Sequence, residues 1–207
     1  PQNDAAANSE VHIALENFYH GVIQLEDQLR ENAAEVINKL QYEGLSTLLL
    51  TGDHPDTARR ISDELKIESW QAELTPNDKA QLINDSLQRG EKVMMVGDGI
   101  NDAPALTSAT VGCALAGSTD IAVESADLIL ARPDLNNLHF ALKLARRSLK
   151  IIRQNLIWAF TYNLVAIPLA ASGKLLPAYG AAAMAVSSIC VVTNSLRLKN
   201  TKEDKRC

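Results

Sequence analysis

Two uncharged apolar runs near the carboxyl end limit what this chain can fold into more than any other feature. Residues 156–172 read LIWAFTYNLVAIPLAAS and residues 178–196 read AYGAAAMAVSSICVVTNSL, and neither run contains a charged residue. Each run approaches the roughly 20 residues that a helix needs to cross a bilayer. The sequence therefore predicts two transmembrane helices, joined by a short turn that contains Gly173, Lys174 and Pro177.

Basic residues flank this predicted hairpin on both outer sides, whereas Lys174 is the one charged residue in its turn. Lys and Arg are enriched in cytoplasmic loops, so both ends of the hairpin are expected in the cytoplasm. The alternative, a buried helical hairpin of a soluble protein, is disfavoured because two charge-free runs with matched basic flanks are uncommon there. The flanking bases are Arg146, Arg147, Lys150 and Arg153 before the hairpin, and Arg197, Lys199, Lys202, Lys205 and Arg206 after it.

Short apolar runs alternate with amphipathic stretches from Val11 to about Leu130. Strands that alternate with helices indicate a parallel sheet with helices on both faces. The predicted fold class is therefore α/β, followed by the α-helical hairpin, with one uninterrupted helix over about residues 135–163 between them. The predicted strands are 11–15, 18–25 with a break at Gly21, 45–50, 70–74, 92–96, 111–116 and 127–131, and the predicted helices are 30–44, 54–67 and 76–89.

Charge and cysteine content limit the partners and the compartment that this chain can have. The formal net charge of -5 gives no basic footprint for nucleic acid, so no nucleic-acid partner is expected. Three cysteines, Cys113, Cys190 and Cys207, are an odd number without paired spacing, which favours a reducing compartment.

A loop rich in oxygen donors follows the strand predicted at 92–96, and it reads GDGIND. Ligands of open α/β sheets bind beyond the carboxyl ends of the strands. Its two glycines allow a sharp turn and a close approach to a ligand, and its oxygens suit Mg²⁺, completed by water and a phosphoryl group. The alternative is that its acids are turn formers and a helix cap. The predicted site residues of this loop are Gly97, Asp98, Gly99, Asn101 and Asp102.

Two other segments carry matching chemistry. The sequence TGD leaves the strand predicted at 45–50, and a hydroxyl with free backbone N–H groups can hold phosphoryl oxygens there. A lysine lies on the first turns of helix 76–89, after the predicted N-cap Thr75. Its ammonium can neutralise negative charge on a phosphoryl group during transfer. Taken alone, the TGD segment is equally well explained as a turn. A lone lysine at such a position is more often a solvated surface residue. The predicted site residues here are Thr51, Gly52, Asp53 and Lys79.

These motifs resemble those of a known family. TGD, TPNDKAQLI and MVGDGINDAPAL are similar to the later motifs of the haloacid-dehalogenase superfamily in the form that P-type ATPases use. YN at 162–163, MAVSS at 184–188 and NSLRL at 194–198 resemble the heavy-metal branch, its copper(I)-transporting members in particular. The resemblance implies a partial haloacid-dehalogenase-like, Rossmann-type phosphorylation domain at 1–134, a basic linker helix at 135–154, two transmembrane helices at 155–198 and a cytoplasmic tail at 199–207.

The resemblance also implies that much of the protein is missing from this chain. P-type ATPases form an aspartyl-phosphate on the Asp of a DKTGT motif, and that string does not occur here. The nucleotide-binding domain, the actuator domain and the metal-binding CPC span are also not in the sequence. The chain is therefore expected to be the carboxyl-terminal third of a pump, inactive alone, with the amino-terminal part as its partner.

The function that the resemblance implies is ATP-driven export of a monovalent metal cation, Cu(I), across the inner (cytoplasmic) membrane. The implied cofactors are Mg²⁺ and ATP, and the implied partners include the lipid bilayer and a copper chaperone. The short turn SGKLLPAYG resembles the subgroup that supplies copper for assembly of respiratory oxidases. Two alternatives stay open: a haloacid-dehalogenase-type phosphatase, which needs its own nucleophile, and an inactive fragment that pairs with a full-length pump.

Roles at the phosphorylation site follow from the same resemblance. Asp98 would bind Mg²⁺, while Thr51 and Lys79 would contact the phosphoryl group. Asp53 would hold its own loop and face the actuator domain. The residues that would shape the magnesium site are Asn101 and Asp102.

The apolar runs carry the candidate path for the transported metal. Met184 offers a thioether, a soft ligand that suits Cu(I), and Ser188 lies on the same helix face. Tyr162 and Asn163 are adjacent, so at most one of them points squarely at that face. The alternative is that the polar residues hold the helices together. Zinc-type members of the family that the chain resembles carry an acid in the second span. None occurs here from residue 175 to residue 196, so the resemblance argues against zinc.

Overall fold

The computed structural model describes residues 9–15, 18–25, 28–132, 134–173 and 176–200. The chain divides into a first unit, Pro1–Asn137, and a second unit, Leu138–Cys207. The finer domain boundaries expected from the sequence stay predictions. The residues that carry sequence-based expectations but lie outside the described ones are Lys174, Lys202, Lys205, Arg206 and Cys207.

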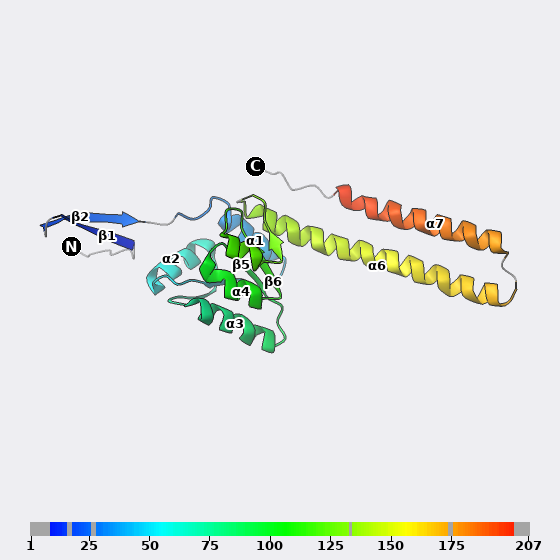
Figure 1. Ribbon diagram of the computed structural model, residues 1–207, viewed down its shortest axis with the longest axis horizontal. Helices are drawn as coiled ribbons and strands as arrows, with labels where there is room; N and C mark the ends of the chain where they lie inside the picture. Colours follow the sequence, from blue (N-terminus) through cyan, green and yellow to red (C-terminus); the bar gives the residue numbers. More distant parts are fainter. Residues whose placement is uncertain (1–8, 16–17, 26–27, 133, 174–175, 201–207) are drawn as a thin grey trace. The chain divides into compact units, whose positions relative to one another are not determined.

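Parallel strands with helices between them build most of the first unit (Figure 1). β3 (Leu48–Leu50) pairs in parallel with β4 (Ser69–Gln71). β5 (Met94–Gly97), β6 (Val111–Ala114) and β7 (Leu128–Ile129) form a second parallel sheet in that order. The predicted parallel α/β architecture is therefore confirmed, although the strands are shorter than expected.

β6 is buried along most of its length, as expected for a strand covered on both faces. A Cβ added at Gly112 would lie 2.6 Å from the carbonyl oxygen of Leu106, so α4 (Ala103–Ser108) packs closely on this strand. Burial raises the pKa of the Cys113 thiol to about 11. The thiol therefore stays protonated near neutral pH and acts as a small apolar group of the core.

The three helices predicted in the first unit are confirmed as α1 (Ala33–Tyr42), α2 (Pro55–Leu65) and α3 (Pro76–Gln88). At the start of α3, the Thr75 hydroxyl accepts the Asp78 N–H at 3.3 Å, and the Asp78 carboxylate accepts the Thr75 N–H at 2.9 Å. The hydrogen bond from the Thr75 hydroxyl, followed by that from its N–H, lowers the pKa of Asp78. This reciprocal cap satisfies backbone N–H groups that the first turn leaves unpaired, and it fixes where α3 begins.

Other parts of the first unit differ from the expectation. α4 and α5 (Asp120–Glu124) were not predicted, because such short helices show no helical period. β1 (Ser9–Leu15) and β2 (Phe18–Leu25) pair antiparallel as a hairpin, whereas a parallel sheet was expected throughout. The register of this hairpin shifts next to Gly21, which has a φ of 154°, although β2 runs through the predicted break without interruption.

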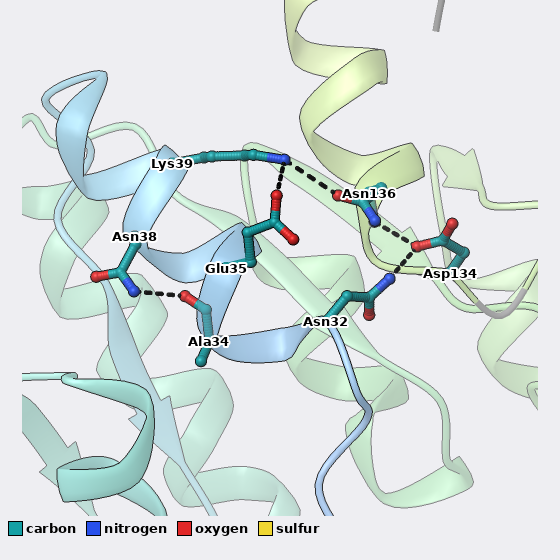
Figure 2. Close-up of polar contacts among 7 residues, drawn as sticks. All are labelled: Asn32, Ala34, Glu35, Asn38, Lys39, Asp134 and Asn136. Carbon is teal, nitrogen blue, oxygen red and sulfur yellow. Dashed lines mark hydrogen bonds and ion pairs between the residues drawn. The ribbon is translucent and has the colours of Figure 1, made fainter. Parts of the chain in front are cut away.

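A polar cluster ties the start of α1 to the residues that open the helix α6 (Asn136–Ala171), as Figure 2 shows. The Asp134 carboxylate accepts the side-chain amide of Asn32 and, at 2.8 Å, the backbone N–H of Asn136. On α1, the Lys39 ammonium lies 2.6 Å from Glu35 and 3.5 Å from the Asn136 side-chain oxygen. Asp134 thus satisfies a backbone N–H of the first turn of α6, which carries no intrahelical partner.

The second unit is a pair of long helices, α6 (Asn136–Ala171) and α7 (Pro177–Leu196), followed by the short η2 (Arg197–Asn200). α6 is continuous, as predicted, and includes Pro168. α6 and α7 run side by side and antiparallel (Figure 1). They are joined by side-chain hydrogen bonds from Asn194 to Asn155 at 2.9 Å and from Asn155 to Ser195 at 3.0 Å.

One segment of the described residues, Ala178–Lys199, is long and apolar enough to cross a membrane, and none of it is buried. This agrees with the second of the two spans expected from the sequence. α6 does not meet the same criterion, so the first span stays a prediction. The part of α6 that was expected to span nevertheless exposes large apolar side chains, among them Ile157, Phe160, Leu164 and Ile167.

Candidate active site

Three segments from different elements carry the predicted site residues of the first unit. Residues 51–53 follow β3, residues 98–102 follow β5, and Lys79 lies near the start of α3. The loop after β3 is fixed to the loop after β4, because Thr51 donates its N–H to the Gln71 carbonyl at 3.0 Å and accepts the Leu74 N–H at 3.1 Å. These backbone bonds continue the parallel pairing of β3 and β4 into the two loops.

Thr51 and Asp53 are bonded to each other. The Thr51 hydroxyl donates to the Asp53 carboxylate at 2.7 Å and accepts the Asp53 N–H at 3.1 Å. A hydroxyl has one proton to donate, so Thr51 must rotate away from Asp53 before it can donate to a phosphoryl oxygen. Gly52 gives the loop room, because an added Cβ would lie 3.3 Å from the Leu74 carbonyl oxygen.

Lys79 and Asp102 form an ion pair, with the ammonium 2.8 Å from the carboxylate. The two residues are 23 positions apart, and their side chains are only 12% and 15% exposed. Largely buried charges require a partner, because removal of one leaves the other uncompensated in a medium of low polarity. Asp102 therefore holds the charge of Lys79 in place, a contact that sequence reasoning missed because it depends on long-range folding.

A positive φ is not what requires glycine in the GDG loop. Neither Gly97 nor Gly99 has a positive φ, and that of Gly99 is −110°. At Gly97 the reason for glycine is steric: an added Cβ would lie 2.7 Å from an Asp102 carboxylate oxygen and 2.8 Å from the Asp102 Cβ. At Gly99 the nearest atom would be 3.8 Å away. Gly97 thus leaves space for the buried carboxylate, whereas Gly99 is under no such constraint.

Asp98 presents its carboxylate to solvent, with 60% of the side chain exposed. Its backbone carbonyl accepts the Thr119 N–H at 3.2 Å, which fixes the loop. The Arg30 guanidinium lies 3.8 Å from the carboxylate. Arg30 was not found from the sequence, since no local pattern links two residues so far apart.

The donor set at this loop fits Mg²⁺ in part. Mg²⁺ is held by one or two carboxylates with waters and phosphate oxygens. Asp98 supplies an exposed carboxylate, and the exposed Asn101 follows in η1 (Ile100–Asp102). One Asp102 oxygen is already engaged by Lys79. Within the described ranges, no group of three or more His, Cys, Asp or Glu side chains is placed so that it could hold a metal ion. Further oxygen ligands are therefore needed.

The hydrogen bonds of the second unit involve all four predicted metal-path residues, and their role as a metal path stays a prediction. The Tyr162 hydroxyl reaches α7, where it donates to the Gly180 carbonyl at 3.2 Å. The Asn163 amide donates to the Ala159 carbonyl of its own helix at 2.9 Å, and the Ser188 hydroxyl to the Met184 carbonyl at 3.0 Å. Tyr162 alone of the adjacent pair therefore bonds to the other helix.

A surface hollow of about 330 Å³ on α6 has a mostly apolar lining. Asn163 is the one metal-path residue among its lining residues, which are Phe160, Thr161, Asn163, Leu164 and Ile167. The hollow therefore offers no soft ligand for a metal ion.

Comparison with known proteins places this chain in a family. The family of haloacid dehalogenase-like hydrolases matches residues 2–110, and the chain belongs to it. The chain is 43% identical over 197 residues, 95% of its length, to the cation-transporting P-type ATPase B of Mycobacterium tuberculosis. It is 41% identical over 194 residues, 94% of its length, to the copper-exporting P-type ATPase of Staphylococcus aureus. These matches confirm the resemblance to heavy-metal P-type ATPases.

The chain spans about a quarter of the length of these relatives, 26% and 24% respectively. Among solved structures, it is similar to a zinc-transporting PIB-type ATPase in the E2.Pi state, with a TM-score of 0.82, 34% identity, and coverage of 94% of this chain and 32% of that one. It is also similar to the catalytic domain of the CPx-ATPase CopB-B, with a TM-score of 0.51, 37% identity, and coverage of 58% and 46%.

The steric role of Gly97 predicts a large effect of one methyl group. Gly97→Ala forces a Cβ against the Asp102 side chain and should lower the free energy of unfolding of the first unit by about 1–3 kcal/mol. Gly99→Ala is the matched control and should change it by less than about 1 kcal/mol. Urea unfolding, followed by Trp70 fluorescence in a Trp158→Phe background, measures both. Equal effects of the two substitutions would show that Gly97 does not make room for Asp102.

Proposed function

We propose that this chain is the carboxyl-terminal part of a heavy-metal P-type ATPase that exports Cu(I) across the inner membrane through an aspartyl-phosphate. The observation that carries the proposal is the largely buried Lys79–Asp102 ion pair, whose Asp102 belongs to the same loop as the exposed Asp98, in a haloacid-dehalogenase-like domain. A lysine held in place and an accessible carboxylate are what phosphoryl transfer with Mg²⁺ requires. The relatives named as P-type ATPases support the same reaction.

Each site residue has a part in this reaction. Asp98, with Asn101 beside it, would hold Mg²⁺, which when bound neutralises charge on the phosphoryl oxygens. Lys79 would offset the charge that spreads over those oxygens in the transition state, with its ammonium oriented by Asp102. The Thr51 hydroxyl would donate a hydrogen bond to the phosphoryl group once its hydrogen bond to Asp53 is broken. The backbone of Gly97 and Gly99 would carry no chemistry of its own.

The nucleophile of this reaction would come from sequence outside the chain. The coverage of a quarter of the relatives' length supports a larger pump, with ATP bound by its amino-terminal part. In that pump the segments 1–134, 135–154, 155–198 and 199–207 would be the partial phosphorylation domain, linker helix, two transmembrane helices and tail. A copper chaperone would be a further partner, and the exported copper would serve oxidase assembly.

Cu(I) is proposed as the cargo on the chemistry of the second unit. Met184 offers a soft sulfur that suits Cu(I), and Tyr162, Asn163 and Ser188 add oxygen or amide groups along the helices. No Asp or Glu lies between residues 138 and 200, so a carboxylate ligand for Zn(II) is not available there. The zinc-transporting structure makes Zn(II) the competing cargo, since it resembles this chain over most of its length.

The proposed chemistry predicts that Asp98 is essential. In the parent protein, rebuilt with the amino-terminal part, Asp98→Ala should lower Mg²⁺-dependent ATP hydrolysis by at least about 100-fold, because the exposed carboxylate that holds the ion is lost. Asp63→Ala, which removes an exposed acid on α2, is the control and should leave turnover unchanged. Full magnesium-dependent turnover in the Asp98→Ala protein would overturn the proposal.

The cargo is tested by ATP hydrolysis of the same parent protein with Cu(I), Ag(I) and Zn(II). Cu(I) and Ag(I) should stimulate hydrolysis, and Met184→Leu should lower that stimulation about 10-fold or more, since Leu has the size of Met without its sulfur. Ile189→Leu, an exposed position of α7, should change it little. Stimulation by Zn(II) alone would refute the copper assignment and leave the phosphorylation chemistry in place.

A further inference from the structure

One end of the second unit is strongly cationic. From residue 138 to residue 200 the sequence contains no Asp or Glu. Basic residues gather on α6 just before its charge-free part and on η2 just after α7. The name cationic end is used for five of them, which are Arg147, Lys150, Arg153, Arg197 and Lys199.

Hydrogen bonds bring the bases of the two segments together. The Arg147 guanidinium donates to the Arg197 carbonyl at 2.9 Å, and the Arg197 guanidinium donates to the Asn194 side-chain oxygen at 3.2 Å. Both acceptors are neutral, so these bonds orient the guanidinium groups without cancelling their charge. Because Asn194 also bonds to Asn155, the charges of α6 and η2 are fixed at the same end of the helix pair.

Exposed apolar side chains lie both within and beside the cationic end, because Leu149 and Ile152 are exposed between its bases on α6. Arg153 is followed on α6 by the exposed Leu156, Ile157 and Trp158, the last 64% exposed. On α7 the exposed Leu196 comes directly before Arg197. Trp is enriched where the headgroup region of a bilayer meets the hydrocarbon. On both helices the charged residues therefore end within a few positions, and the exposed surface beyond them is apolar and uncharged.

From this arrangement we infer that the cationic end binds the headgroups of anionic phospholipids, whose acyl chains lie along the exposed apolar side chains that follow. A phosphodiester headgroup with attached hydrocarbon matches both parts of the surface, whereas free phosphate or an acidic peptide matches only the charge. Bases next to a membrane attract anionic lipids, and the attraction weakens as salt shortens the screening length. The inference rests on the membrane placement of the second unit in the proposed function.

Trp158 allows a direct measurement of which lipid lies beside the cationic end. In the Trp70→Phe chain Trp158 is the one tryptophan left, and it is placed in vesicles with brominated phosphatidylcholine or brominated phosphatidylglycerol. At low salt, phosphatidylglycerol should be preferred by about fivefold or more, since one base near the surface contributes about 1 kcal/mol. The preference should fall when salt is added.

Substitutions identify the residues responsible. The preference for phosphatidylglycerol should fall close to one in a variant that combines Lys150→Gln, Arg153→Gln, Arg197→Gln and Lys199→Gln. A variant with Arg153→Lys and Arg197→Lys keeps the positive charge and should keep the preference for phosphatidylglycerol. The control, Arg59→Gln with Lys92→Gln, removes exposed bases of the first unit and should also retain it.

Three other outcomes would each contradict the inference. Equal quenching by the two lipids in the unsubstituted cationic end would overturn the inference and leave membrane insertion standing. Absence of quenching by either lipid would overturn the membrane placement, and the inference with it. Loss of the preference on addition of millimolar glycerol phosphate would show a site for free phosphate instead of a lipid surface.

Discussion

The contact between Lys79 and Asp102 is the interaction on which the candidate active site depends. It joins the first turns of α3 to the loop after β5, and it lies largely out of water. The neighbouring residues follow from it: Gly97 lacks a side chain because the Asp102 carboxylate occupies that space. Asp98, one position on, is left exposed and accessible. One largely buried ion pair thus fixes a positive group against the loop that also carries the accessible Asp98 carboxylate.

The two units have opposite electrostatic character, and each suits a different medium. The first unit is rich in acids, among them those of the loops that follow β3 and β5. The second unit has no acid between residues 138 and 200, exposes large apolar side chains, and pairs its helices through amide and hydroxyl groups such as Asn155 and Asn194. Exposed apolar surface on this scale marks contact with a bilayer or with other protein segments, in agreement with coverage of only a quarter of the relatives' length.

Local signals predicted much of the fold, and long-range contacts account for what was not predicted. The alternation of apolar and amphipathic segments predicted the parallel α/β unit, and Thr75 with Pro76 predicted where α3 begins. The three segments of the site could be found because each of them follows a predicted strand or lies at the start of a predicted helix. The Lys79–Asp102 and Arg30–Asp98 contacts join residues distant in sequence, and no local pattern encodes them. The steric role of Gly97 was missed for the same reason, since it depends on where the Asp102 side chain lies.

A double-mutant cycle on Lys79 and Asp102 tests this account most directly. Lys79→Met and Asp102→Ala are made singly and together in the Trp158→Phe background. The free energy of unfolding of the first unit is then measured by urea, with Trp70 as the reporter. Each single change should cost about 3–5 kcal/mol because it leaves a charge uncompensated. The double change should cost less than the sum by about 1–3 kcal/mol. Additive effects, with a coupling near zero, would contradict the claim that this ion pair organises the site.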